Sequence, residues 1–191
     1  ADSSGDLTVR YNLGKIYEMA GDYAKAVELY QKTDGRMDQV TAPMYEALGD
    51  LYVNGKGVRR NLKEASEWYE KAAKQGHAAA QFEFGIGYHK GIGVEQSFEK
   101  AIEWLEKSAK QGDSEGQVLL GLSYCMGTGV EQSFEKAAEW FEKAAQQGYA
   151  GAQYSLAYCY HNGEGVEQSD SKAAEWLMKS AQQGYAKAQY Y

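Results

Sequence analysis

The stretch HAAAQFEFGIGYHKGIGVEQSFEKAIEWLEKSAKQG, residues 77–112, decides the fold because the chain repeats its pattern every 36 residues. A Gly-x-Gly-Val segment recurs at 55–58, 91–94, 127–130 and 163–166. At a constant offset each copy carries a tryptophan, in turn Trp68, Trp104, Trp140 and Trp176. A Gln-Gly pair closes each copy. A fixed period of this size indicates a stacked repeat array, in which surface is buried between neighbours rather than in one globular core.

Within this stretch we expect a helix over 77–90, a turn over 91–97 and a second helix over 98–110. The glycines at 91 and 93 permit backbone conformations that a side chain would penalise. Ser97 stands where a helix N-cap belongs. One proline in the whole chain, with abundant Ala, Glu, Lys and Gln, favours helix throughout. The sequence therefore predicts an all-α fold built from antiparallel helix pairs.

Two features of the repeat predict how its helices pack. A small residue recurs in each first helix, and a tyrosine follows three positions later, so we expect these positions to line a close seam between helices. The small residues are Gly49, Gly85, Gly121 and Ala157. In the second helix Glu103 and Lys107 stand four apart, an order that favours an ion pair. The same spacing recurs in the other three copies, at Glu67/Lys71, Glu139/Lys143 and Glu175/Lys179.

Composition narrows the classes of partner. A net charge of -7 and a pI near 5.1 argue against nucleic acid, which needs a basic face. No apolar run approaches the ~20 residues needed to cross a bilayer, and no signal peptide is visible at residues 1–10. We expect a soluble chain, and the compartment stays open between cytoplasmic, periplasmic and secreted. Cys125 and Cys159 are too few for a disulfide framework and are expected to be free thiols.

The repeat resembles a known family. The motif Ala78-x-Ala80-Gln81-x-x-Phe84-Gly85-x-x-Tyr88, followed by Gly-x-Gly-Val and by Lys100-Ala101-x-x-Trp104-x-x-Lys107-x-Ala109, is similar to the Sel1-like repeat. Upstream, the segment from Leu13 to Lys32 lacks the Gly-x-Gly-Val insertion and looks more like a tetratricopeptide repeat. The resemblance implies a right-handed α-α superhelix, or solenoid, whose first helices line a concave face. It also implies an adaptor or scaffold role, often in bacteria.

On this basis the chain divides into six parts. They are an N-terminal tetratricopeptide-like hairpin with its connector (1–40), four Sel1-like repeats (41–76, 77–112, 113–148 and 149–184), and the start of a fifth repeat or a C-terminal cap (185–191).

The resemblance also implies where a partner binds. In tetratricopeptide arrays the ligand meets inward-facing residues of the first helices. In this chain those positions differ from copy to copy while their neighbours do not, so packing does not dictate them. The predicted contact residues are Tyr11, Lys15, Glu46, Asp50, Phe82, Ile86, His89, Val118, Leu122, Met126, Tyr154, Tyr158 and His161. The set is polar and acidic at its N-terminal end and apolar and aromatic beyond it. Such a groove suits a peptide with several apolar anchors, although these side chains could instead be partly buried and bind nothing.

Three chemical alternatives were weighed. His89, Cys125 and His161 share one repeat position, but first helices ~8–10 Å apart hold such side chains too far apart for one metal ion. Ser-x-x-Lys occurs at 97–100, 133–136 and 169–172, as in serine β-lactamases, but the companion motifs are absent and helix capping explains the serine. The Gly-x-Gly turns lack the preceding strand of a phosphate-binding loop.

We therefore expect no catalytic residue, metal or cofactor, and a non-enzymatic scaffold whose partner is a protein or peptide. The alternative is an assembly subunit that contacts partners, or itself, through its convex face or its C-terminal edge. An enzyme is the third and most distant choice.

Overall fold

The computed structural model describes residues 3–32 and 41–189, and these residues form helices and turns with no strand. This confirms the prediction of an all-α chain. Most of the predicted connector, residues 33–40, lies outside the described residues, as do residues 190 and 191 of the C-terminal segment. The chain divides into two compact units, Ala1–Ser97 and Phe98–Tyr191.

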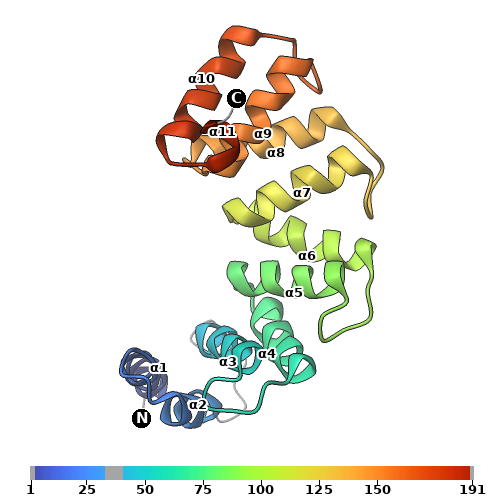
Figure 1. Ribbon diagram of the computed structural model, residues 1–191. Helices are drawn as coiled ribbons and strands as arrows, with labels where there is room; N and C mark the ends of the chain where they lie inside the picture. The colour runs from blue at the N-terminus through green and yellow to red at the C-terminus, as the bar shows by residue number, and fades with distance from the viewer. Residues whose placement is uncertain (1–2, 33–40, 190–191) are drawn as a thin grey trace. The chain divides into compact units, whose positions relative to one another are not determined.

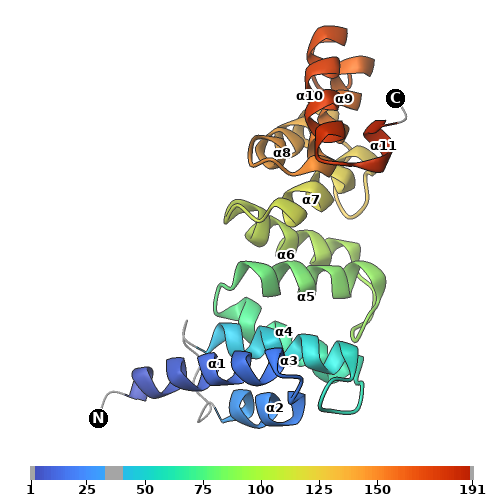
Figure 2. The ribbon, with the colours of Figure 1, turned by 60° about the vertical axis from the view of Figure 1, so that its left-hand side comes forward.

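Each unit is built from successive helix pairs (Figure 1). The first unit holds α1 (Ser3–Met19), α2 (Tyr23–Gln31), α3 (Ala42–Asn54), α4 (Leu62–Lys74) and α5 (Ala78–Lys90). The second holds α6 (Phe98–Lys110), α7 (Ser114–Met126), α8 (Phe134–Gln146), α9 (Ala150–Asn162), α10 (Asp170–Gln182) and α11 (Ala186–Gln189). The antiparallel pairs are α1 with α2, α3 with α4, α7 with α8, and α9 with α10. The later pairs pack on the helix before them, through contacts of α3 with α2, α7 with α6 and α9 with α8, and the short α11 lies against α10 (Figure 2).

The helix ends follow from side chains that satisfy backbone groups. At the start of α4, the Asn61 side chain accepts a hydrogen bond from the Glu64 N–H at 3.2 Å. The hydroxyl of Ser133 accepts from the Lys136 N–H at 3.3 Å at the start of α8. The helix α5 ends at Gly91, whose φ of 68° lies in the left-handed region that glycine favours. These caps explain why repeats with different surfaces keep the same helix lengths.

The predicted close approach between paired helices is confirmed at two of the small residues. A Cβ built on Gly121 would lie 2.6 Å from the Phe141 ring of α8, and one on Gly49 would collide with the Tyr69 ring of α4. The ring that fills the seam therefore comes from the second helix rather than from the tyrosine three positions later. The helix pair closes here because the first helix offers no side chain.

A buried glutamine links each of the last three full repeats to the preceding second helix. The Gln117 amide donates to the Ala109 carbonyl at 3.0 Å, and the Gln81 amide donates to the Ala73 carbonyl at 3.0 Å. Each carbonyl lies in the last turn of a helix and also accepts the N–H of the glycine three residues later, Gly112 or Gly76. The glutamine adds a second, buried hydrogen bond to this carbonyl and stabilises the junction between repeats.

The turns also contact the preceding repeat. A Cβ on Gly93 would collide with the carbonyl oxygen of Leu62, at the start of α4. A Cβ on Gly129 would lie 2.5 Å from the carbonyl oxygen of Phe98, at the start of α6. The second glycine of each turn therefore lies directly against backbone of the repeat before it.

The Glu–Lys pairs predicted at four-residue spacing are not among the ion pairs of the described residues. Instead, each lysine lies over the tryptophan three residues before it. The distances from Nζ to the ring centroid are 3.7, 3.8, 4.0 and 4.0 Å for Lys71, Lys107, Lys143 and Lys179. A tryptophan face is the best aromatic partner for a cation. The glutamate of each predicted pair is exposed. It therefore costs little free energy for its carboxylate to stay solvated instead of forming an ion pair.

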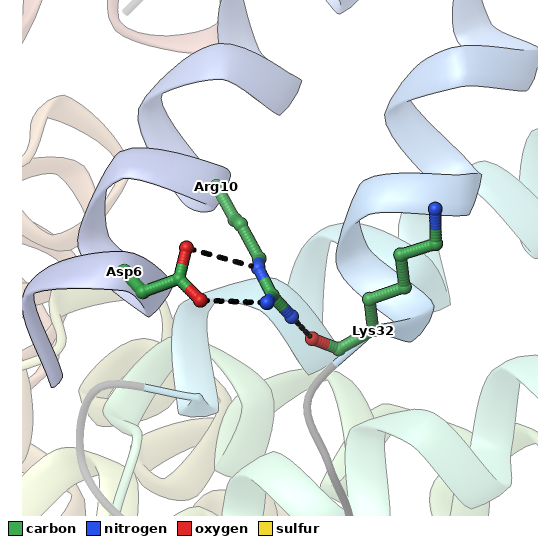
Figure 3. Close-up of polar contacts among 3 residues, drawn as sticks. All are labelled: Asp6, Arg10 and Lys32. Atoms are coloured by element: carbon green, nitrogen blue, oxygen red, sulfur yellow. Dashed lines mark hydrogen bonds and ion pairs between the residues drawn. The ribbon is translucent and has the colours of Figure 1, made fainter. Parts of the chain in front are cut away.

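Arg10 joins the two helices of the N-terminal hairpin (Figure 3). Its guanidinium pairs with the Asp6 carboxylate on α1, with Nη2 to Oδ2 at 2.6 Å, and also donates to the Lys32 carbonyl at the end of α2. A cation at a helix C-terminus complements the partial negative charge of the last carbonyls. This contact fixes the exit of α2.

Candidate partner-binding surface

The first-helix face of the first unit is acidic. Glu46 and Asp50 lie one turn apart on α3, and the charges of Glu18 on α1 and Glu83 on α5 act on Glu46. Lys15 on α1 partly compensates them, since its Nζ lies 3.3 Å from Glu18 Oε1. Four carboxylates around one ammonium group leave this face able to attract a basic side chain.

Glu46 responds most strongly to this environment. Burial, reinforced by the charges of Asp50, Glu83 and Glu18, raises the pKa of Glu46 to about 7, although Lys15 opposes the rise. The carboxyl is therefore partly protonated near neutral pH. A cation that approached it would favour the ionised form and release a proton.

Two tyrosines from second helices reach this face, in addition to the contact residues predicted on the first helices. The Tyr69 hydroxyl donates to Asp50 Oδ1 at 2.6 Å, and the Tyr30 hydroxyl donates to Glu18 Oε1 at 2.6 Å. Burial first, then the hydrogen bond to the carboxylate, raises the pKa of both phenols. A sequence signal existed, because the later repeats carry leucine or phenylalanine at this position (Leu105, Phe141 and Leu177).

The remaining predicted residues of the first unit lie beside apolar surface. Phe82, Ile86 and His89 on α5 are half-buried, and Tyr11 packs its ring 6.0 Å from that of Tyr30. A hollow of about 230 Å³ opens between α4 and α5. Its lining is mostly apolar and includes Leu62, Tyr69, Ile86 and Ile92. Two charged residues, Glu83 and Lys90, also line it. The unit thus places an apolar recess next to an acidic face.

The first-helix face of the second unit is apolar and exposed. Leu122 and Met126 on α7 are 38% and 62% exposed, and Tyr158 on α9 is 46% exposed. Val118, by contrast, packs against the core formed by α8 and α9. Tyr154 packs its ring 5.5 Å from that of Tyr185. Of the predicted residues here, Leu122, Met126, Tyr158 and His161 are exposed, and the first three form the large apolar or aromatic part of that surface.

A second hollow, of about 290 Å³, lies between α9 and α10. It is lined by Tyr154, Ala157, Tyr158, His161, Asp170, Ala173, Ala174 and Leu177. Its edge carries a polar pair, with His161 Nδ1 2.9 Å from Asp170 Oδ1. One repeat earlier, the corresponding residues Ala138 and Phe141 are buried under α9 by Leu156.

The structure gives structural roles to the residues of the chemical alternatives. The hydroxyls of Ser133 and Ser169 accept hydrogen bonds from the N–H groups of Lys136 and Lys172 as N-caps. Both cysteines are free thiols, as expected. Burial raises the pKa of Cys125, and it raises that of Cys159 to about 12, so both thiols are protonated at neutral pH and unreactive. No group of three metal-binding side chains occurs among the described residues.

The pattern of the Sel1 repeat matches residues 9–33, 42–77, 78–113, 114–149 and 150–185. The chain belongs to the Sel1 repeat family. The N-terminal hairpin is thus matched as a Sel1 repeat as well, and both repeat types belong to the tetratricopeptide-like superfamily. Sel1-repeat proteins are generally protein-interaction scaffolds without catalytic activity.

Two solved structures agree with this membership, and a curated protein matches part of the chain. A protective antigen of uropathogenic Escherichia coli strains, with an SLR fold, is 33% identical at a TM-score of 0.89 over 97% of this chain and 40% of its own. A Sel1 repeat protein from Oxalobacter formigenes is 31% identical at a TM-score of 0.86 over 94% of this chain and 72% of its own. Human protein O-mannosyl-transferase TMTC2 is 30% identical over 89 residues, which are 44% of this chain and 10% of that protein. The chain therefore spans well under two thirds of the antigen and of the transferase. In the described part of this chain, no helix is both long and apolar enough to span a membrane.

Proposed function

We propose that this chain is a non-enzymatic adaptor that binds a protein segment on the faces formed by its first helices. The observation that carries the proposal is the exposure of Leu122, Met126 and Tyr158 on α7 and α9. Large apolar side chains on a soluble surface mark interaction sites when they gather on one face. Methionine and tyrosine are enriched where proteins contact partners.

The two units favour different parts of a ligand. In the second unit, the exposed row of Leu122, Met126 and Tyr158 suits the apolar face of an amphipathic helix. In the first unit, Glu46, Asp50 and Glu83 suit a lysine or arginine side chain. The proposed ligands are therefore protein segments with apolar anchors for the second unit and with basic residues for the first.

A display library of random peptides, panned against the immobilised chain, tests the proposal. We expect enrichment of peptides with apolar anchors and of peptides with lysine or arginine. The variant Leu122→Asp/Met126→Asp should lose the peptides with apolar anchors, because it places charge on the apolar row without touching the core. Gln146→Asp on α8, also at an exposed position, is the matched control.

Retention of the same peptides by the Leu122→Asp/Met126→Asp variant would refute binding on this face. Circular dichroism of both variants checks that helicity is unchanged. If only acidic peptides were enriched, the proposal that the acidic face of the first unit binds lysine or arginine side chains would be contradicted.

A further inference from the structure

The turn of the first full repeat reverses the charge found in the turns of the later ones. Four basic residues occupy positions in and after this turn: Lys56, Arg59, Arg60 and Lys63. Each of the three later repeats carries two negative charges and no positive one at these four positions. We call Lys56, Arg59, Arg60 and Lys63 the basic turn. Because the repeats share one backbone, the difference in charge is not required by packing.

Arg60 shows that the structural role of its position is preserved. In the later repeats the glutamine at this position donates to a carbonyl of the first helix, as Gln96 does to His89 at 2.8 Å. Gln132 and Gln168 make the same bond to Cys125 and His161 at 2.7 and 2.8 Å. Arg60 Nε donates to the corresponding carbonyl, that of Val53, at 3.0 Å. Arg60 therefore makes the same structural hydrogen bond as the glutamines, and it adds a positive charge that the fold does not require.

The charges of the basic turn are not neutralised within the described part of the chain. All four side chains are exposed, and none of them pairs with a carboxylate among the described residues. The nearest acid in the sequence, Glu64, is already engaged. It accepts from the Asn61 amide at 3.2 Å, and the Tyr52 hydroxyl also bonds to it.

The basic turn borders a hollow rather than a flat surface. Tyr52, Val58, Arg59, Arg60, Asn61 and Glu64 line an open hollow of about 540 Å³. The Nζ of Lys56 lies 5.1 Å from the centre of the Tyr23 ring on α2. Two neighbouring guanidinium groups beside a recess can each receive a carboxylate through paired hydrogen bonds.

We propose that the basic turn is a second binding surface, which takes an acidic protein segment rich in aspartate and glutamate. Charge complementarity selects this occupant, because four positive charges stand together in a chain whose net charge is -7. That same net charge repels the long phosphate backbone of a nucleic acid, which would extend beyond four residues onto acidic repeats. The basic turn belongs to the first unit, whereas Leu122 and Met126 belong to the second. Its acidic ligand is opposite in charge to the basic side chains proposed to bind Glu46 and Asp50.

The experiment measures fluorescence anisotropy of a labelled octapeptide of alternating glutamate and alanine. The variant Arg59→Glu/Lys63→Glu should weaken binding by about tenfold or more, since it replaces two attractive charges with repulsive ones. The fold should tolerate it, because the later repeats carry glutamate at Glu95 and Glu99 in the same positions. Binding to the intact chain should also weaken steeply with added salt.

A transplant provides the matched control. The variant Glu131→Arg/Gln132→Arg/Glu135→Lys copies three of the four basic side chains onto the third repeat while the original basic turn stays in place. We expect it to bind the peptide more tightly than the intact chain does. Unchanged binding by Arg59→Glu/Lys63→Glu would overturn the proposal. A labelled DNA duplex that bound more tightly than the acidic peptide would overturn it as well, by assigning the surface to nucleic acid.

Discussion

Replacing Glu46 with glutamine should stabilise the protein at alkaline pH and have little effect at acid pH. The folded state raises the pKa of this carboxyl from its ordinary value of 4.5 to about 7. Between these two values the folded chain binds more protons than the unfolded chain. The free energy of unfolding that depends on Glu46 is therefore greatest below pH 4.5, falls as the pH rises, and stops falling above about pH 7.

The size of the effect follows from the same two values. At about 1.4 kcal/mol for each pH unit, the full difference would correspond to about 3 kcal/mol. Glu46 is only half-buried, so solvent screening reduces this to about 1–2 kcal/mol. Glutamine keeps the shape and the hydrogen-bonding capacity of the protonated acid, and it cannot ionise. We therefore expect Glu46→Gln to gain about 1–2 kcal/mol of stability at pH 8 over pH 5.

Urea unfolding followed by circular dichroism measures this at both pH values. Glu139→Gln, which removes an exposed carboxylate from α8, is the control and should show no such pH dependence. Comparing variant and parent at each pH removes the contribution of all other titrating groups. If Glu46→Gln shifted stability equally at pH 5 and pH 8, the electrostatic account of the acidic face would be wrong.

Three further changes test the packing, each measured by urea unfolding. Gly121→Ala should cost about 1–2 kcal/mol, because the overlap with the Phe141 ring outweighs the helix propensity that alanine adds; a stabilised variant would show that the seam has room. Lys107→Met should lower the free energy of unfolding by about 0.5–1 kcal/mol because the contact with Trp104 is lost. The loss should be the same when Glu103 has also been removed. Ser133→Ala should cost about 1 kcal/mol through loss of the N-cap, whereas Ser133→Asp should retain stability.

The period and the helix pairs were predictable because each is encoded locally and repeated. The small residues Gly49 and Gly121 also predicted the close approach correctly. The identity of the ring that fills the seam was not predictable from the first helix alone, because Tyr69 and Phe141 reach it from the second helix. The spacing of small residues along the helix indicates that a large side chain fills the seam. Only the pairing of helices in the tertiary structure shows which side chain it is.

Lys107 shows a second limit of local reasoning. A glutamate stands four residues before it and a tryptophan three before it, and both spacings permit a contact on a helix. The structure places the ammonium 3.8 Å from the Trp104 ring centroid. An exposed ion pair and a cation–aromatic contact have similar energies, so sequence spacing could not choose between them.

The candidate contact residues stay a prediction, and the sequence pattern did not identify all of their neighbours. Variation between copies pointed to Glu46 and Asp50, which lie one turn apart on α3. Glu83 and Tyr69 were missed because they come from other helices and approach only when the pairs stack. The charge that surrounds Glu46 is a property of three helices together, and no single repeat contains it.

The turn glycines bear on how such an array can lengthen. Gly93 lies against the backbone of Leu62, and Gly129 lies against that of Phe98, so this part of each junction meets the main chain of its neighbour. Main chain is the same whatever the side chains are. A copy inserted by gene duplication would therefore find a fitting neighbour at this contact at once, without compensating substitutions. The surface of each copy, such as the basic turn, could then diverge on its own.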